Sequence, residues 1–427
     1  MKSALQIIRT LYSLMLSVML VMMGNSLFAT LVALRADIEG YPNSIIGFMT
    51  SAYFIGFAIG TLQAGPIINR AGHIRSFAVF AAIAAATILS FLLIVEPWAW
   101  VVFRMIMGAS IAGCFVVQES WLNNRATNQT RGVLLSLYIM VGYFASAVGQ
   151  LSIQLGDPID VQVFLFCGIL LCLAIVPVSL TRATNPEPVE RARLNFNKLF
   201  TTSPTAAAGC FLGGVLIGSL WAFGPIYSRD LGLGIDQIAI FMSAIVIGGF
   251  ILQLPIGRLS DAFDRRTVLL AVSITAVLPA SLLVFGAPFG TLSLYITIGL
   301  FGGLISTIYP ISVAYANDYL SKDDIVSSTA GFVFAFGIGA IVGPLATSTS
   351  ISIFGYGGLF ILALLALITL TSIIIWRMRV RHWAATVDKE KFVVMAGSPT
   401  QAMASELNPN VEVDENYNIG PDKLTTN

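Results

Sequence analysis

The sequence predicts an all-α membrane protein in which twelve transmembrane helices form two pseudo-symmetric six-helix bundles. Composition is the first observation: of 427 residues, 56% are apolar and 11% are charged, whereas soluble globular proteins carry about 25% charged residues. The second observation is a series of long uncharged runs, and the third is the placement of basic residues between those runs. A water-soluble fold could not cover its surface with so few polar side chains, so lipid is the expected solvent.

Ten runs account for the twelve spans. A helix needs about 20 residues to cross the hydrocarbon core, and eight runs each supply one helix. They are residues 10–34, 40–69, 76–95, 97–118, 132–156, 161–181, 199–228 and 237–257, in which Arg104 is the one charge. Two further runs, 267–317 and 325–376, exceed 50 residues, so each is predicted to fold into two helices that break near residues 287–290 and 354–358. Barrel strands would instead alternate in polarity over about 10 residues.

Basic residues predict the orientation of these spans. If both termini are cytoplasmic, 20 of the 23 basic residues fall in cytoplasmic segments, and the exceptions are Arg35, Arg104 and Arg229. Membrane proteins concentrate Lys and Arg on the cytoplasmic side. A helix count changed by one would destroy this alternation. We therefore expect a multi-pass protein with both termini in the cytoplasm.

Polar segments predict the domain boundaries. Residues 182–203 contain two prolines and four basic residues and are predicted to be a cytoplasmic linker. This linker separates an N-terminal six-helix bundle at 1–181 from a C-terminal six-helix bundle at 204–378. Residues 379–427 are polar and are predicted to form a disordered cytoplasmic tail.

Two features recur at a half-chain offset. The segments 65–75 and 257–266, which start 192 residues apart, both run from a glycine through a short polar residue to basic residues. In each half, an acidic residue ends an even-numbered span and a glycine 13 residues later opens the next span; the acidic residues are Glu119 and Asp318. Two independent matches indicate a duplicated six-helix unit.

The chain resembles the major facilitator superfamily over roughly residues 9–378. The segments 65–75 and 257–266 are similar to the family's motif between the second and third helices. Arg104 lies in a segment similar to the family's fourth-helix arginine motif, and the Gly- and Pro-rich residues 337–344 are similar to its antiporter motif.

Two further segments resemble one subgroup of this family. Residues 119–123 and 309–318 resemble a little-characterised bacterial subgroup without a settled substrate. The resemblance implies a secondary transporter of the bacterial inner membrane that works as a monomer. It also implies alternating access, in which the two bundles rock around a central site that opens to one side at a time.

The energy source is constrained but not identified. No G-x-x-x-x-G-K-[ST] loop is present, so ATP is not the expected source. Proton coupling is the commonest mode in the family that the chain resembles. However, no Asp or Glu lies near the centre of a predicted span, which leaves facilitated diffusion open. The 337–344 motif favours efflux slightly over import. The expected partners are a small-molecule substrate, the lipid bilayer and protons, with no nucleic acid, cofactor or metal.

Charged residues at the cytoplasmic ends of the spans are candidates for an inner gate, because the pattern occurs in both halves. They are Arg70, Arg75, Glu119 and Arg131 in the first half, and Asp261, Arg265, Arg266 and Asp318 in the second. The alternative is that they are static, partly solvated caps that fix the topology.

Arg104 is the first candidate for substrate binding. It lies about six residues into the fourth span, where an unpaired cation costs about 2.5–3.5 kcal/mol. Water in a cavity, backbone carbonyl groups, an acid or an anionic substrate could offset this cost. The alternative is that its side chain extends to the outer interface.

Polar and aromatic residues within the spans complete the candidate substrate site. They are Asn25, Gln150, Trp221 and Tyr309. For each of them, a contact between neighbouring helices is an equally good interpretation. As a set they predict a cavity for a neutral or amphiphilic organic solute with at most one anionic group.

A sensor and an enzyme are the two other functional classes to compare with a transporter. The alternative from another class is a non-transporting membrane solute sensor with the same fold, whose tail would bind a cytoplasmic partner. An enzyme is not expected, because no catalytic constellation is evident and both histidines, His73 and His382, fall in predicted cytoplasmic segments.

Overall fold

The computed structural model describes residues 2–125, 131–180, 203–285, 290–318 and 322–380. Over these ranges the chain forms twelve α-helices and one short 3-10 helix, η1 (Ser152–Leu155). The α-helices are α1 (Lys2–Ile38), α2 (Asn43–Ala71), α3 (His73–Leu93), α4 (Pro97–Arg125), α5 (Arg131–Leu151), α6 (Val161–Ser179), α8 (Pro204–Asp230), α9 (Ile235–Ala262), α10 (Arg265–Val284), α11 (Thr291–Asn317), α12 (Lys322–Phe354) and α13 (Gly358–Val380).

Twelve helices of the described chain are long and apolar enough to cross a membrane, which confirms the predicted number of spans. The two longest uncharged runs break where the glycines and the proline predicted it: residues 285–290 separate α10 from α11, and residues 355–357 separate α12 from α13. Gly290 has φ 93° and Gly355 has φ 69°. Side chains other than glycine rarely adopt this left-handed conformation, so both breaks depend on glycine.

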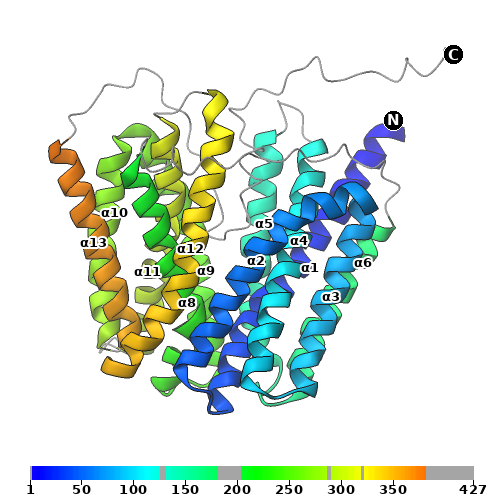
Figure 1. The fold of residues 1–427 in the computed structure, drawn as a ribbon, viewed down its shortest axis with the longest axis horizontal. Coiled ribbons are helices and arrows are strands. Elements are labelled where there is room, and N and C mark those ends of the chain that lie inside the picture. Colours follow the sequence, from blue (N-terminus) through cyan, green and yellow to red (C-terminus); the bar gives the residue numbers. More distant parts are fainter. Residues whose placement is uncertain (1, 126–130, 181–202, 286–289, 319–321, 381–427) are drawn as a thin grey trace.

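The helices form two bundles with the same internal packing (Figure 1). In the first bundle α1 packs on α5 and α6, α2 on α4, and α3 on α4 and α6. In the second, α8 packs on α12 and α13, α9 on α11, and α10 on α11 and α13. Each contact in one bundle has its counterpart in the other, as the duplicated unit predicts.

Close backbone contacts recur at the same half-chain offset. A Cβ atom at Gly56 of α2 would lie 1.8 Å from the carbonyl oxygen of Met105 in α4. In the second bundle, a Cβ at Gly248 of α9 would lie 1.9 Å from the carbonyl oxygen of Gly299 in α11. Gly56 and Gly248 occupy equivalent places in the two halves, and small residues allow transmembrane helices to approach this closely.

The described chain begins in α1 and ends in α13 at the same end of the molecule, and the helices diverge toward that end, whereas the two bundles converge at the opposite end (Figure 1). At the converging end α2 contacts α12: the Ser51 hydroxyl donates to the carbonyl oxygen of Ile341 at 2.6 Å, and Gly47 lies against the backbone of Pro344. Nearer the middle, α5 contacts α9, where the Tyr143 hydroxyl donates to Gln253 at 2.9 Å.

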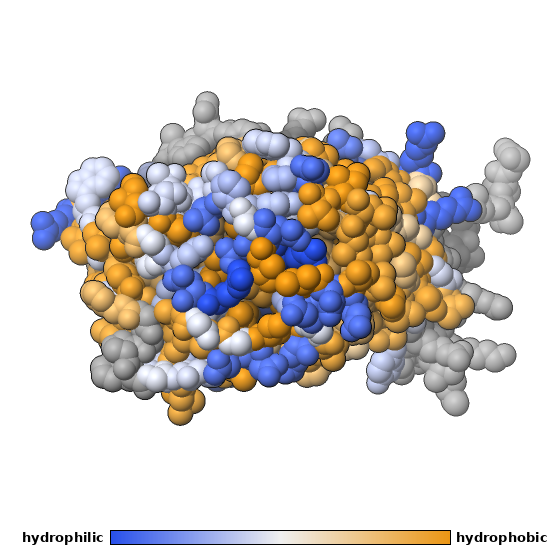
Figure 2. Space-filling view, turned by 90° about the horizontal axis from the view of Figure 1, so that it is seen from below, coloured by the Kyte–Doolittle hydropathy of each residue, from blue (hydrophilic) through white to orange (hydrophobic). Residues whose placement is uncertain are grey.

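Side-chain polarity follows the two environments of a membrane protein. Large apolar side chains are exposed along the helices, such as Leu62 at 69% and Leu278 at 67%. Hydrophilic side chains gather on the end face opposite the termini, with hydrophobic ones around it (Figure 2). The sides of the molecule therefore suit hydrocarbon, and this end suits water. The predicted linker at 182–203 and the predicted tail at 379–427 lie outside the described residues except at their edges.

Candidate functional site

A cavity of about 160 Å³ lies between the two bundles. Helices α1, α2, α4 and α5 contribute its wall on one side, and α8, α9 and α11 on the other. The lining residues are Met22, Asn25, Ser26, Ala29, Thr50, Tyr53, Phe54, Arg104, Phe115, Tyr138, Ile139, Gly142, Tyr143, Ser146, Ile217, Trp221, Ile245, Val246, Gly249, Gly302 and Ser306. The site thus combines side chains from both halves of the duplicated fold.

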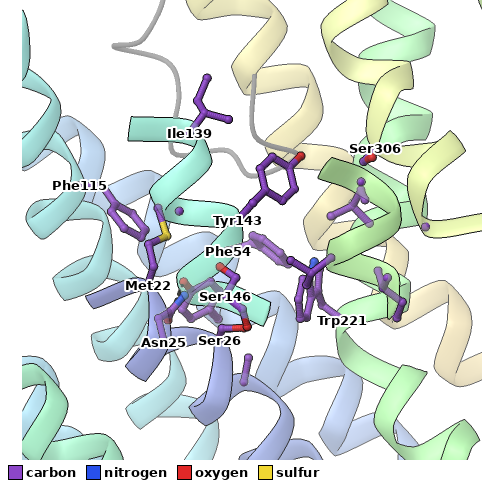
Figure 3. Close-up of a pocket in the computed structure, with 18 of the residues that line it drawn as sticks. Met22, Asn25, Ser26, Phe54, Phe115, Ile139, Tyr143, Ser146, Trp221 and Ser306 are labelled. Atoms are coloured by element: carbon purple, nitrogen blue, oxygen red, sulfur yellow. Dashed lines mark hydrogen bonds between the residues drawn. The ribbon is translucent and has the colours of Figure 1, made fainter. Parts of the chain in front are cut away.

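The two walls differ in polarity. The N-terminal bundle supplies the guanidinium of Arg104 and most of the hydroxyl and amide groups of the lining. The C-terminal bundle supplies aliphatic side chains and glycines, together with Trp221 and Ser306. Figure 3 shows Asn25 and Ser26 of α1 near Ser146 of α5, with Trp221 of α8 across from them. The cavity is therefore polar on one side and largely apolar on the other.

Arg104 of α4 lies in the cavity wall and is 4% exposed. Its guanidinium carbon lies 4.6 Å from the centre of the Tyr53 ring on α2. A cation over an aromatic face gains about 0.5–2 kcal/mol, which offsets part of the cost of burial. Its Nε and Nη1 atoms have no hydrogen-bond partner among the described residues.

Tyr53 connects Arg104 with a second predicted residue. The Tyr53 hydroxyl donates to Oδ1 of Asn25 at 3.3 Å. Arg104, Tyr53 and Asn25 therefore form one contiguous group from α4, α2 and α1. The sequence did not single out Tyr53, because one tyrosine among apolar neighbours carries no signal that distinguishes a cavity residue from a packing residue.

Gln150 of α5 lies behind the cavity wall. Its Nε2 donates to the hydroxyl of Ser26 at 2.8 Å and to the carbonyl oxygen of Ser26 at 3.0 Å, and Thr30 donates to its Oε1 at 2.6 Å. The side chain is fully buried and is not among the described lining residues. In this structure it joins α5 to α1 and holds Ser26, which does line the cavity.

Trp221 and Tyr309 occupy different environments. Trp221 lines the cavity from the C-terminal bundle (Figure 3). Tyr309 of α11 is 3% exposed and packs with its ring centre 4.9 Å from that of Phe336. Tyr309 is not among the described residues of the cavity wall.

Glu119, a candidate gate residue, is connected to the cavity through Tyr138. Tyr138 of α5 lines the cavity, and its hydroxyl donates to Oε1 of Glu119 on α4 at 3.0 Å. Glu119 is 1% exposed. His73 is buried near it as the first residue of α3, 3.0 Å from the hydroxyl of Ser120. The sequence predicted His73 to lie in a cytoplasmic segment, and the structure places it at the first position of α3.

The candidate gate residues of the second half form a cluster around Arg265. Its Nε lies 2.9 Å from the carboxylate of Asp318 after α11, and its Nη2 lies 3.3 Å from that of Asp261 on α9. The neighbouring Arg266 lies 3.7 Å from Asp264, the residue before α10. Arg265 is 1% exposed, so this ion pair is buried. The cluster joins α9, α10 and α11 within one bundle.

The remaining candidate gate residues belong to the N-terminal bundle. Arg70, near the end of α2, and Arg75, near the start of α3, are exposed. The side chain of Arg131 lies outside the described residues. The contacts given above for Glu119 and Arg265 all lie within a single bundle, at the end where the two bundles diverge.

At the opposite end an ion pair joins the two bundles. Arg229 of α8 pairs with Asp37 of α1, and the hydroxyl of Tyr356 donates to Asp37 at 3.5 Å. Burial and the nearby Asp37 carboxylate raise the pKa of Tyr356 above its ordinary value. The sequence named Arg229 only as an exception to the basic pattern, because hydropathy does not show which helix ends of the two halves meet.

Comparisons with known proteins agree with this architecture. The Major Facilitator Superfamily matches the chain over residues 14–249 and 206–407. An uncharacterized MFS-type transporter, YcaD of Escherichia fergusonii, is 28% identical over 356 residues, which cover 83% of this chain and 92% of that protein. Another, Ent638_1421 of Enterobacter sp. strain 638, is 30% identical over 358 residues, with the same shares covered.

Solved structures show the same fold. The nucleoside transporter NupG superposes with a TM-score of 0.71 at 15% identity, covering 87% of this chain and 99% of that one. A bacterial homolog to the human lysosomal transporter Spinster, in an inward-facing and occupied conformation, has a TM-score of 0.70 at 14% identity, covering 88% and 98%. The relatives point to a transporter rather than an enzyme, and none of them supports the alternative of a solute sensor. The family match and the relatives show that the chain belongs to the major facilitator superfamily and is a multi-pass membrane transporter.

Proposed function

We propose that the protein is a secondary transporter that moves a small organic solute through the inter-bundle cavity by alternating access. The observation that carries this proposal is the cavity itself, which is lined by both bundles and combines Arg104 with amide, hydroxyl and aromatic groups. A site between two bundles can change its access when the bundles rotate against each other. The membrane is proposed to be the bacterial inner membrane, and the protein is proposed to act as a monomer.

The distribution of basic residues supports the proposed orientation. With both termini in the cytoplasm, the end at which Asp37 and Arg229 meet faces outward. Contacts between α2 and α12 reinforce the closure of that end. The structure then corresponds to an inward-facing state, in which the outer entrance is closed.

The inner gate is proposed to close in the opposite state. Arg265 and Asp318 now pair within the C-terminal bundle, and Glu119 accepts from Tyr138 within the N-terminal bundle. Closure of the cytoplasmic side brings the inner ends of the two bundles together. We propose that Arg70, Arg75 and Arg131 then approach the acidic residues of the other half, while the Asp37–Arg229 pair separates.

Export, driven by protons, is the proposed direction and coupling. The Gly- and Pro-rich residues 337–344 of α12 support export, and the absence of a nucleotide-binding loop leaves an ion or solute gradient as the energy source. Transport with and without an imposed pH gradient separates proton coupling from facilitated diffusion.

The test uses purified protein in liposomes loaded with a panel of amino acids, sugars, nucleosides and monocarboxylates, with mass spectrometry of the released solutes. The control carries Asp37→Cys and Arg229→Cys and is cross-linked by a short reducible bis-thiol reagent, which prevents the bundles from separating at that end. Protein-dependent release that stops on cross-linking and returns on reduction supports transport by alternating access. Release that cross-linking leaves unchanged, or no protein-dependent release of any solute, contradicts it.

A further inference from the structure

The electrostatics of the cavity are set by one residue. Arg104 is the only charged residue among the described residues that line it, so no carboxylate of this wall neutralises the guanidinium. The side chain is 4% exposed, so bulk water solvates it little. A buried cation without an opposite charge is costly, and proteins pair such groups or use them to bind an anion.

The Tyr53 ring contacts only one face of the Arg104 guanidinium. The ring lies 4.6 Å from the guanidinium carbon and so covers a face of the planar group. The N–H donors point outward in the plane, where they match the two oxygens of a carboxylate. Within the part of the chain that the structure describes, Nε and Nη1 donate to nothing. Both nitrogens are buried, so the guanidinium carries hydrogen-bond capacity that the described residues leave unsatisfied.

Neighbouring polar groups extend the donor surface. The Tyr53 hydroxyl donates to Oδ1 of Asn25, so the amide nitrogen of Asn25 keeps its N–H groups for another acceptor. Thr50, on the same helix as Tyr53, adds a hydroxyl to the lining. An anionic group would therefore meet a charged donor and neutral donors on the N-terminal bundle.

The opposite wall is suited to an apolar body. Ile217, Ile245 and Val246 present aliphatic side chains, and Trp221 adds an aromatic ring. Gly249 and Gly302 also line this wall, where both lie close to neighbouring side chains. A solute with its charge near Arg104 would place its hydrocarbon part against these residues of the C-terminal bundle, and burial of apolar area stabilises that arrangement.

We propose that the transported solute is an amphiphilic monoanion: one carboxylate or similar anionic group on a compact aromatic or aliphatic body, with the anionic group held by Arg104. The single positive charge of the cavity favours one negative charge over two and disfavours cations. This inference rests on the proposed function, since it names the substrate class of the same site. It assigns the anionic end to the N-terminal bundle and the apolar end to the C-terminal bundle.

Equilibrium binding to the purified protein tests the substrate class separately from transport. The probes are phenylacetate, 3-phenylpropionate, 4-phenylbutyrate, indole-3-acetate, hexanoate and octanoate, each compared with its own primary amide and measured by calorimetry at pH 7. The amide keeps the shape of the acid but lacks the charge. Because hydrogen bonds to a charged group are the strong ones, at least one acid should bind about 10- to 100-fold more tightly than its amide.

Variants locate the effect. Arg104→Gln should abolish the preference for the acid while the amide affinity changes little, and Arg104→Lys should retain a weaker preference because Lys keeps the charge but not the planar donors. Arg258→Gln removes an exposed arginine of α9 and should leave the preference unchanged. If Arg104→Gln does not fold, the comparison of each acid with its amide on the unchanged protein still tests whether binding requires the negative charge.

The outcomes separate this inference from the proposed function. Acid-selective binding that depends on Arg104 supports the inference even if liposomes show no release, in which case only the transport proposal fails. Equal affinity for acids and amides, no binding of any acid, or an acid preference that survives in Arg104→Gln overturns the inference. If liposomes release a neutral solute and binding shows no preference for acids, the transport proposal stands and the inference of a monoanionic substrate fails.

Discussion

Asp37 of α1 and Arg229 of α8 form an ion pair that joins the two bundles at the end opposite the termini. The two residues lie 192 positions apart in the chain and close the same end at which α2 meets α12. Their side chains are 16% and 43% exposed, so water screens the pair in part. The pair therefore contributes at most modestly to the stability of the fold.

Arg229→Gln should shift the bundles apart at that end with little loss of stability. Partly exposed ion pairs contribute at most about 1 kcal/mol, which changes a population by up to about fivefold. Spin labels at Glu96→Cys and Asp236→Cys, which are exposed on different bundles at this end, should show a larger share of long distances. The charge-swapped variant Asp37→Arg with Arg229→Asp should return the distribution toward that of the natural protein. An unchanged distribution in Arg229→Gln would show that the pair does not hold the bundles together.

Gly56→Ala and Gly248→Ala should each destabilise the protein. The added Cβ would lie 1.8 Å or 1.9 Å from a carbonyl oxygen of the facing helix, so two packed helices must separate. Overpacking of this kind costs about 1–3 kcal/mol and occasionally more. Thermal unfolding in detergent should show a lower midpoint for both variants. Gly65→Ala is the control on α2, because nothing lies within 4 Å of its Cβ position. Equal midpoints for Gly56→Ala and Gly65→Ala would contradict the close contact.

The aromatic ring of Tyr53 should matter more for stability than its hydroxyl. Tyr53→Phe keeps the face under Arg104 and loses only the hydrogen bond to Asn25, whose net value is about 1 kcal/mol. Tyr53→Leu also removes the cation–π contact and should cost about 1–2 kcal/mol more. Unfolding midpoints of the two variants, each with and without Arg104→Gln, measure the coupling between the two residues. If Tyr53→Leu is no worse than Tyr53→Phe, the contact contributes nothing.

The Arg265–Asp318 pair should show strong non-additivity. Arg265 is 1% exposed and Asp318 is 6% exposed, and breaking such a buried pair costs up to about 3–5 kcal/mol. Asp318→Asn should cost less than Arg265→Met, because Arg265 keeps its contact with Asp261. Asp318→Asn alone and Arg265→Met alone should therefore each lower the unfolding midpoint, whereas the double variant should cost less than the sum of the two. Additive losses would mean that the two side chains act independently.

The spans could be predicted from sequence because hydrocarbon imposes one strong constraint: about 20 residues with almost no charge. The halves could be predicted because duplication leaves equal spacings, and Gly56 and Gly248 now show that the equivalence extends to backbone contacts. The cavity could be predicted only in part. Arg104 was evident as the one charge in its span, and Asn25 and Trp221 as polar or aromatic residues, and all three line the cavity.

The remaining cavity residues left no pattern in the sequence. A soluble helix marks its buried face by hydrophobic periodicity, but a transmembrane helix is apolar toward lipid and toward its neighbours alike. Tyr53 and Tyr138 therefore could not be distinguished from packing residues, although they line the cavity. For Gln150 and Tyr309 the sequence left substrate contact and helix packing equally open, and in this structure both pack between helices. The pairing of Asp37 with Arg229 depends on how two separate bundles meet, which no local pattern encodes.

The central claim is that the cavity opens to each side of the membrane in turn, and the most direct measurement is the reactivity of one cysteine in its wall. Ser146→Cys is placed in a background in which the four native cysteines are replaced by alanine, and a membrane-impermeant maleimide is added to either side of oriented vesicles. We predict labelling from the side that carries the termini, and additional labelling from the other side once Arg229→Gln weakens the outer closure. Labelling from neither side, or from the same single side in both proteins, would contradict alternating access.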